Sequence, residues 1–261
     1  MGEKYRKISV MFTDAHVPYH SPESLEVVKK VVQALKPNYV SSLGDMLDCS
    51  QFSTHDPTYG VDNTELSEDI RFLQRFYDDI QKDIKEKLIM VEGNHEQRVT
   101  RWAAKTKEGR AVYNMVAPHI QLMKTSKGDP RAKAIYVKYG SADGKYPHYK
   151  LNSRICLIHG WSYASHVTAQ HVKMSMGRSI ILGHCHRMES KIVQNVWGAG
   201  SVQCHAIGCL CQKVPLYGCG APVEWVNGLC VGYHGRHSDT VYPIHMVNGA
   251  CVLPDGREIK V

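Results

Sequence analysis

Five short polar clusters in the sequence combine aspartate, asparagine and histidine side chains. In chain order they are Asp14-Ala15-His16, Gly44-Asp45-Met46-Leu47-Asp48, Gly93-Asn94-His95-Glu96, His159-Gly160 and Gly183-His184-Cys185-His186. Carboxylate and imidazole ligands together suit Mn²⁺, Fe or Zn²⁺. Cys185 is the one cysteine in the five clusters, so soft sulfur ligands are nearly absent from them. Glycines beside four of the clusters allow the backbone to turn sharply and to approach a ligand closely. The clusters therefore predict a metal site with mixed nitrogen and oxygen ligands.

Each cluster comes at the end of a segment whose apolar residues are typical of a β-strand. These segments span residues 8–12, 38–43, 88–91, 154–158 and 179–182. In α/β sheets, ligands bind at the carboxyl ends of the strands. We therefore expect the five clusters, although distant in sequence, to meet at one edge of the fold.

Helical patterns separate the strands of the first half. One helix begins at Ser21-Pro22-Glu23, where a serine cap precedes proline and an acid in the first turn, and it ends at Lys36-Pro37. A second, amphipathic helix carries one apolar face, formed by Ile70, Leu73, Phe76, Ile80 and Ile84. Further helical segments are expected at 94–106, 109–123 and 165–176.

The second half changes to short strands from about residue 190, separated by turns that include Asn227-Gly228 and Asn248-Gly249. Alternating strands and helices followed by mostly antiparallel strands predict two packed mixed β-sheets flanked by helices, which is an α/β fold. We expect one domain over residues 1–261, with a polar insert at about 49–63 and a strand-rich, cysteine-rich part from about 190.

Composition places the chain among globular proteins. Of its 261 residues, 43% are hydrophobic and 22% charged, and none of its apolar stretches reaches the roughly 18–20 residues of a membrane span. The net charge of +7 is spread along the chain, so it is weak evidence for a nucleic-acid partner. The start of the chain runs into a strand without an apolar signal segment. We expect a soluble, cytoplasmic protein that does not bind membranes.

Nine cysteines are present, and five of them fall close together near the end of the chain: Cys204, Cys209, Cys211, Cys219 and Cys230. Their spacings contain no C-x-x-C pair, which a structural zinc site would usually show. We expect reduced, mostly buried thiols. A second metal site or a disulfide is the alternative.

The ordered set Asp-x-His, Gly-Asp-x-x-Asp, Gly-Asn-His-Glu, His and Gly-His-x-His resembles the calcineurin-like metallophosphoesterase superfamily. The motifs run from Asp14 to His186, and the overall look is that of the small phage or prokaryotic members. The resemblance implies a four-layer α/β/β/α sandwich that binds two divalent transition-metal ions. Mn²⁺ is the expected metal, with Fe, Zn²⁺ and Ni²⁺ as alternatives. A phage-encoded member would act in the host cytoplasm.

The resemblance also implies a ligand set for each metal. The first metal would be held by Asp14, His16, Asp45 and His186. The second would be held by Asp45, Asn94, His159 and His184. Asp45 would then bridge two cations and screen their repulsion, and a bridging hydroxide would attack phosphorus in line.

Two further residues, His95 and Asp48, receive roles from the same motifs. His95 would protonate the leaving oxygen, and Asp48 would orient His95 and keep it cationic. The chain has Cys49-Ser50 where protein Ser/Thr phosphatases have Arg-Gly, so it lacks their phosphate-binding arginine. Arg98, one helical turn after His95, could replace that arginine and would join Asn94 in binding substrate. Glu96 is expected to be an acid in the first turn of a helix and not a ligand.

These features favour a dimetal phosphoesterase that hydrolyses phosphodiesters, phosphomonoesters or both. The Gly-His-Cys-His ending resembles the diesterase branches of the superfamily, so we expect cleavage of activated diesters with monoesterase activity beside it. A metal-dependent DNA or RNA nuclease is the alternative among enzymes. A non-catalytic metal-binding scaffold is the alternative from another class. The sequence leaves the oligomeric state open.

Overall fold

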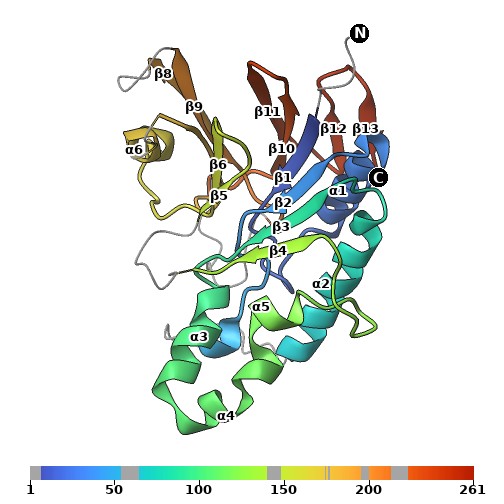
Figure 1. Ribbon diagram of the computed structural model, residues 1–261, viewed down its shortest axis with the longest axis vertical. Helices are drawn as coiled ribbons and strands as arrows, with labels where there is room; N and C mark the ends of the chain where they lie inside the picture. The colour runs from blue at the N-terminus through green and yellow to red at the C-terminus, as the bar shows by residue number, and fades with distance from the viewer. Residues whose placement is uncertain are drawn as a thin grey trace.

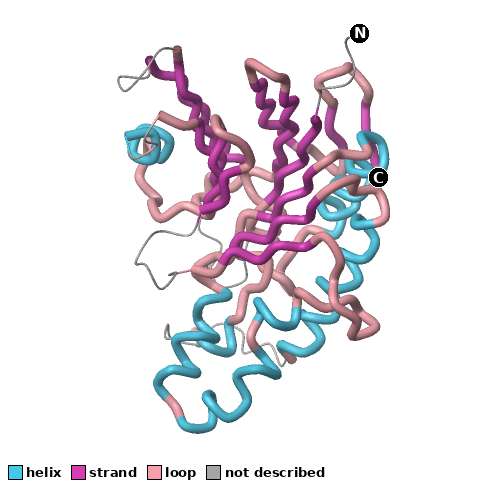
Figure 2. The backbone as a smooth tube through the Cα atoms, in the orientation of Figure 1, coloured by secondary structure: helices cyan, strands magenta, loops and turns pink. Residues whose placement is uncertain are grey.

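The computed structural model describes residues 7–53, 65–139, 148–173, 175, 177–194, 200–212 and 223–261. Two β-sheets lie face to face, with helices on their outer sides (Figures 1 and 2). None of the described helices is long and apolar enough to cross a membrane.

The first sheet joins strands from the two ends of the chain in the order β11-β10-β1-β2-β3-β4. Its parallel strands are β1 (Lys7–Phe12), β2 (Tyr39–Ser42), β3 (Lys87–Val91) and β4 (Ala134–Val137). Its antiparallel strands are β10 (Gly228–His234) and β11 (Asp239–His245). A separate two-stranded ribbon is formed by β12 (Ala250–Val252) and β13 (Glu258–Lys260).

The second sheet has the order β5-β6-β7-β9-β8. Its parallel strands are β6 (Ile155–Ile158), β7 (Ser179–Leu182) and β9 (Ser201–Ile207). Antiparallel strands form the two edges: β5 (His148–Lys150) and β8 (Met188–Gln194).

Six helices and one 3-10 turn are described. They are α1 (Pro22–Leu35), α2 (Leu66–Gln81), α3 (Glu96–Lys105), α4 (Lys107–Val116), α5 (Pro118–Gln121), α6 (Val167–Lys173) and η1 (Ser50–Phe52). The expected start of α1 is confirmed, because the Ser21 hydroxyl accepts a hydrogen bond from the Ser24 N–H at 3.1 Å and Pro22 is the first helical residue. Lys36 ends that helix in a left-handed conformation.

The side-chain alternation of β3 shows why the first sheet is covered on both faces. Leu88 and Met90 pack in the cluster that contains the apolar faces of α1 and α2. Ile89 and Val91 point the other way and pack against Leu157 of the second sheet. Because alternate residues of a strand face opposite sides, one short apolar run contributes to two cores.

Strand β7 repeats this arrangement in the second sheet. Ile181 packs in the core between the sheets, whereas Ile180 and Leu182 pack with Val167 and Val172 of α6. The layers are therefore helices, sheet, sheet and helix, and the predicted α/β/β/α fold is confirmed.

Two expectations need correction. Asn227-Gly228 is not a turn: Gly228 opens β10 opposite His245, and the Asn227 amide donates to the Cys211 carbonyl at 2.8 Å. The three-residue strand β5 was not expected, because its edge position gives it no apolar run. Asn248-Gly249 does turn, with φ of 49° and 70°. Of the expected insert at 49–63, residues 54–63 lie outside the described residues.

Candidate metal centre

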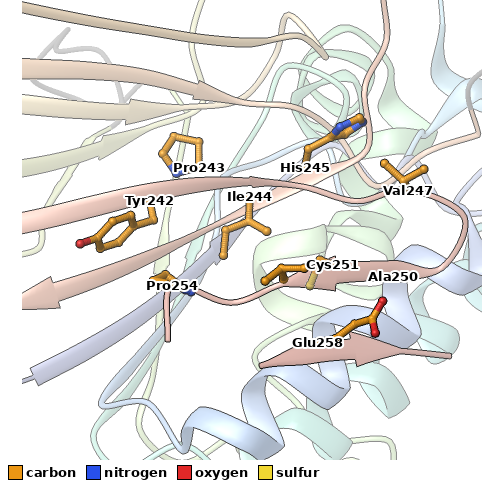
Figure 3. A pocket seen from close by; sticks show the side chains of 10 residues that line it. Tyr242, Pro243, Ile244, His245, Val247, Ala250, Cys251, Pro254 and Glu258 are labelled. Atoms are coloured by element: carbon orange, nitrogen blue, oxygen red, sulfur yellow. The ribbon is translucent and has the colours of Figure 1, made fainter. Parts of the chain in front are cut away.

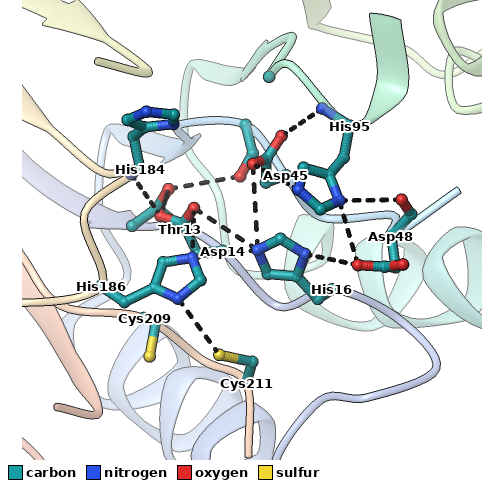
Figure 4. A network of polar contacts seen from close by, with 12 residues as sticks. Thr13, Asp14, His16, Asp45, Asp48, His95, His184, His186, Cys209 and Cys211 are labelled. Carbon is teal, nitrogen blue, oxygen red and sulfur yellow. Dashed lines mark hydrogen bonds and ion pairs between the residues drawn. The ribbon is translucent and has the colours of Figure 1, made fainter. Parts of the chain in front are cut away.

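The carboxyl ends of parallel strands from both sheets meet at one place, and the five polar clusters lie there. Three clusters follow β1, β2 and β3 of the first sheet, and two follow β6 and β7 of the second. His16 and His186 are 170 positions apart in sequence, yet their Nε2 atoms lie 3.1 Å apart. Figure 4 shows the side chains of these loops pointing toward one another.

Two buried carboxylates, Asp14 and Asp45, form the middle of the cluster. One oxygen of each is held by the backbone: the His184 N–H donates to Asp14 Oδ2 and the His95 N–H to Asp45 Oδ1, both at 2.8 Å. The other oxygen of each, Asp14 Oδ1 and Asp45 Oδ2, is buried without a hydrogen-bond partner. Buried carboxylate oxygens without donors are costly, so these two positions fit cation ligands.

Imidazole nitrogens face both of these oxygens. His186 Nε2 lies 3.2 Å and His16 Nε2 3.8 Å from Asp14 Oδ1. His159 Nε2 lies 3.2 Å from Asp45 Oδ2. The His184 nitrogen Nδ1 is in turn 3.2 Å from His159 Nε2.

Asp45 lies between two groups of imidazoles. Asp45 Oδ2 lies 3.9 Å from His16 Nε2 of the first group and 3.2 Å from His159 Nε2 of the second. Asn94 Oδ1 completes the second group at 3.0 Å from His159 Nε2. The donor set brought together here, imidazole nitrogens with carboxylate and amide oxygens, suits divalent cations.

Three of the histidines are oriented through the ring nitrogen that points away from the centre. His16 Nδ1 bonds Asp48 Oδ1 at 3.0 Å, and His159 Nδ1 bonds the Leu43 carbonyl at 2.8 Å. His186 Nδ1 faces the Cys211 sulfur at 3.9 Å. In each case Nε2 is left to face the centre, which is the usual arrangement around metal-binding histidines.

Five of the seven predicted ligands have a left-handed backbone: Asp14 (φ 54°), His16 (50°), Asp45 (49°), His184 (71°) and His186 (57°). Residues with a Cβ disfavour this region by roughly 1–2 kcal/mol. Such conformations persist only where the surrounding fold imposes them, and they gather at functional sites. The loops therefore hold their ligands at an energetic cost.

Two positions at the centre require glycine, because the backbone there lies very close to the two aspartates. A Cβ on Gly93 would overlap the Asp45 carboxylate, and one on Gly183 would overlap Thr13 and the Asp14 carboxylate. These positions let neighbouring loops press against the two aspartates.

The electrostatics keep the carboxylates charged. Burial alone would raise the pKa of Asp14, but the His186 and His16 imidazoles hold this pKa below its ordinary value. The pKa of Asp45 is held low in the same way, against burial, by His159. Charged aspartates are the form that binds cations.

The histidines divide into two groups. Burial lowers the pKa of His184 to about 4 and also lowers that of His186, which favours the neutral imidazole that offers a lone pair. Burial alone would lower the pKa of His159, but the charge of Asp45 raises this pKa to about 9. His159 would therefore release a proton when it binds a metal.

His95 lies beside this cluster and contacts Asp48 and Arg98. Its Nδ1 faces two acceptors, the Asp48 carbonyl at 2.9 Å and Asp48 Oδ1 at 3.1 Å, so Nδ1 carries a proton. Its Nε2 accepts from the Arg98 guanidinium at 3.1 Å and lies 3.8 Å from Asp45 Oδ2. Asp48 thus contacts the His95 ring through Nδ1.

Glu96 has a larger role than the sequence suggested. It is buried at 2% exposure, and its carboxylate accepts four backbone N–H groups. The donors are Met46 at 2.7 Å and Leu47, Asp45 and Gly93 at 3.0 Å. Glu96 therefore fixes the loop that carries Asp45. In the sequence, only its position next to Asn94-His95 indicated that Glu96 could have a role at the site. Its hydrogen bonds to residues 45–47 depend on the tertiary fold and could not be predicted.

Two cysteines near the end of the chain, Cys209 and Cys211, lie close to His186. Cys204, Cys209, Cys211 and Cys230 are buried free thiols, and Cys219 lies outside the described residues. The sulfurs of Cys209 and Cys211 lie within 4.8 Å of each other and of a His186 nitrogen. The spacing of the cysteines in the sequence did not predict that this pair would lie beside His186, a predicted metal ligand.

Of two cavities among the described residues, one lies away from the candidate metal centre and the other adjoins it. One, of about 560 Å³, lies between β11 and β12 beside Tyr242, Ile244 and Val252 (Figure 3), and none of its lining residues belongs to the polar clusters. The other, of about 440 Å³, is lined by Asn94 and Arg98 and therefore adjoins the centre.

Comparison with known proteins identifies a family. Residues 10–188 match the family described as calcineurin-like phosphoesterase. None of the curated proteins matches the chain.

Solved structures of similar fold have low sequence identity. Vacuolar Protein Sorting 29 from Cryptosporidium parvum is 13% identical, with a TM-score of 0.49 and coverage of 98% of this chain and 100% of that one. Vps29 from Chaetomium thermophilum is 12% identical, with a TM-score of 0.48 and coverage of 98% and 91%. Nuclease MPE from Pseudomonas putida is 10% identical, with a TM-score of 0.35 and coverage of 90% and 87%.

Proposed function

Because this chain belongs to the calcineurin-like phosphoesterase family, we propose that it is a metal-dependent hydrolase of phosphodiesters, with monoesterase activity beside it. The observation that carries the proposal is the pair of buried, partnerless oxygens, Asp14 Oδ1 and Asp45 Oδ2, each faced by imidazole nitrogens. When bound, two divalent cations supply activation of water and stabilisation of charge on phosphoryl oxygens.

Seven side chains form the proposed ligand set. The first cation would be held by Asp14, His16, Asp45 and His186, and the second by Asp45, Asn94, His159 and His184. Mn²⁺ is the metal we propose, since the set mixes hard oxygen with imidazole ligands. The proposed domain is the whole chain, because strands β8 to β11 complete the same two sheets that carry the ligands.

Hydrolysis forms a P–O bond to water and breaks the P–O bond to the leaving alcohol, whose oxygen takes a proton. We assign that proton to His95 Nε2, with Asp48 holding the ring through Nδ1. In the described arrangement Nε2 accepts from Arg98. A guanidinium that turns onto the phosphate would leave Nε2 free to face the leaving oxygen.

The diester preference rests on the fixed cations near the site. A monoester dianion needs more neutralisation than a diester, and the chain lacks the arginine that follows the second aspartate in protein phosphatases. Arg98 is the described cation that contacts His95, and it is also bonded to the Asp48 carbonyl at 2.9 Å. A singly charged diester therefore suits this site better.

Metal add-back tests the proposal. Metal-depleted protein should be inactive, and Mn²⁺ should restore hydrolysis of bis(4-nitrophenyl) phosphate, with slower turnover of 4-nitrophenyl phosphate. Zn²⁺, Ni²⁺ and Mg²⁺ serve as comparison metals. Turnover of the monoester alone would contradict the diester preference. No turnover with any metal would favour the non-catalytic scaffold.

A nuclease is the second candidate, and one observation favours it. The cavity beside Asn94 is lined by several cations and by an indole ring. A polyanion with aromatic bases matches such a surface better than a small phosphate ester does.

A further inference from the structure

A cavity of about 440 Å³ adjoins the proposed metal centre on the side of α3. Asn94, a proposed metal ligand, forms one wall. Side chains of α3 form a second wall, and Phe52 of η1 contributes to a third. A substrate phosphate at the centre would therefore lie beside this cavity.

Three cations line the α3 wall. Arg98, Arg101 and Lys105 follow one another at spacings of three and four, so they share one face of the helix. At 1.5 Å per residue, they cover about 10 Å along the helix axis. No acidic residue is among the described residues that line the cavity. This wall therefore attracts an extended anion.

Two aromatic rings lie on the same cavity. The rings of Phe52 and Trp102 have centroids 4.9 Å apart and are tilted by 56°. Phe52 is partly buried against the main apolar core, which fixes the position of the pair. An anchored aromatic pair beside a row of cations is the combination that single-stranded nucleic acids use, with bases on rings and phosphates on cations.

The cavity is connected to the proposed catalytic groups through Arg98. Its guanidinium bonds His95 Nε2 at 3.1 Å and the Asp48 carbonyl at 2.9 Å. Since His95 is assigned to the leaving oxygen, the group that enters the cavity is the leaving-group side of the substrate.

We infer that this cavity binds the leaving-group side of a single-stranded nucleic acid, with a base on Trp102 and the next phosphate on Arg101 and Lys105. The inference rests on the proposed function and narrows its substrate to an oligonucleotide. A duplex keeps its bases stacked on each other, and an acidic peptide would use the cations without the rings.

Binding to metal-free protein tests the inference without turnover. A fluorescent single-stranded dodecamer is titrated in EDTA at several salt concentrations, and its anisotropy is followed. Trp102→Ala should weaken binding about 5- to 100-fold with an unchanged salt slope, because it removes stacking. The double variant Arg101→Gln/Lys105→Gln should reduce the salt slope by about 0.7 per lost phosphate contact.

The matched control is Lys127→Gln/Lys191→Gln, which makes the same charge change at exposed positions outside the cavity lining. Its affinity and salt slope should stay close to those of the unaltered protein. Equal affinities for the control and both cavity variants would overturn the inference. Poly-glutamate that competes as well as the oligonucleotide, with no effect of Trp102→Ala, would also overturn it.

The proposed function fails separately. If no metal restores hydrolysis of either bis(4-nitrophenyl) phosphate or 4-nitrophenyl phosphate, the phosphoesterase proposal is wrong, and the narrowed substrate is wrong with it. If hydrolysis is restored but the cavity variants bind like the control, the function stands and the cavity assignment alone is wrong.

Discussion

Replacing Glu96 by glutamine should destabilise the protein far more than its position at a helix start suggests. One carboxylate oxygen accepts from the Met46 and Leu47 N–H groups, and the other from those of Asp45 and Gly93. Glutamine offers one carbonyl oxygen and one NH₂ group. The NH₂ group would face two backbone donors, whichever way the amide is turned.

The magnitude follows from those two lost acceptors. A buried donor without a partner costs about 1–3 kcal/mol, so two cost about 2–6 kcal/mol. Burial and the charge of Asp45 raise the pKa of Glu96 to about 7. Glutamine carries no charge, so the variant loses the repulsion between residue 96 and Asp45, and this offsets part of the decrease in the free energy of unfolding. We therefore expect the free energy of unfolding to fall by about 2–4 kcal/mol, which lowers Tm by about 4–16 °C in a domain of this size.

Thermal unfolding followed by circular dichroism, on metal-depleted protein at neutral pH, measures the effect. Glu108→Gln is the control, because Glu108 is an exposed acid in the first turn of α4. Its Tm should stay within about 2 °C of the unaltered protein. A Glu96→Gln variant that unfolds at the unaltered temperature would refute the role given to Glu96.

Three other outcomes are expected. His95→Ala should keep the metals and lower kcat by about 10²–10⁴, most for poor leaving groups, and an equal loss for nitrophenyl esters would assign His95 to structure instead. Burial lowers the pKa of His205 to about 4, so the folded state takes up fewer protons than the unfolded state, and stability is lost as pH falls from about 6.5. The free energy of unfolding, measured by urea unfolding, should therefore fall by about 2 kcal/mol less between pH 7 and pH 5 in His205→Asn than in the unaltered protein. Gly183→Ala should reduce metal affinity, measured by calorimetry, because its Cβ would overlap the Asp14 carboxylate.

Much of the fold is encoded locally and could be predicted. The apolar strand around Met90 and the serine cap of α1 depend on neighbours in sequence, and both appear at the predicted positions. Strand β5 depends instead on pairing with β6, as shown by Tyr149 opposite Leu157. A strand of three residues carries too little apolar pattern to be predicted alone.

The candidate site divides in the same way. The seven predicted ligands carry their signal in residue type, and the structure brings them together. Glu96, Cys211 and Trp102 could not be assigned roles beforehand, because each acts on residues distant in the chain: Glu96 on Met46, Cys211 on His186, and Trp102 on Phe52. Such contacts exist only after the tertiary fold has brought the loops and helices that carry these residues together.

Metal stoichiometry tests the central claim most directly. Mn²⁺ binding is measured by calorimetry and by elemental analysis of the dialysed complex, for the unaltered chain and for Asp45→Asn. Two ions per chain are expected in the unaltered protein, and both should be lost or greatly weakened in Asp45→Asn, since Asp45 Oδ2 faces histidines of both groups. Retention of two tightly bound ions by Asp45→Asn would contradict the two-metal centre described above.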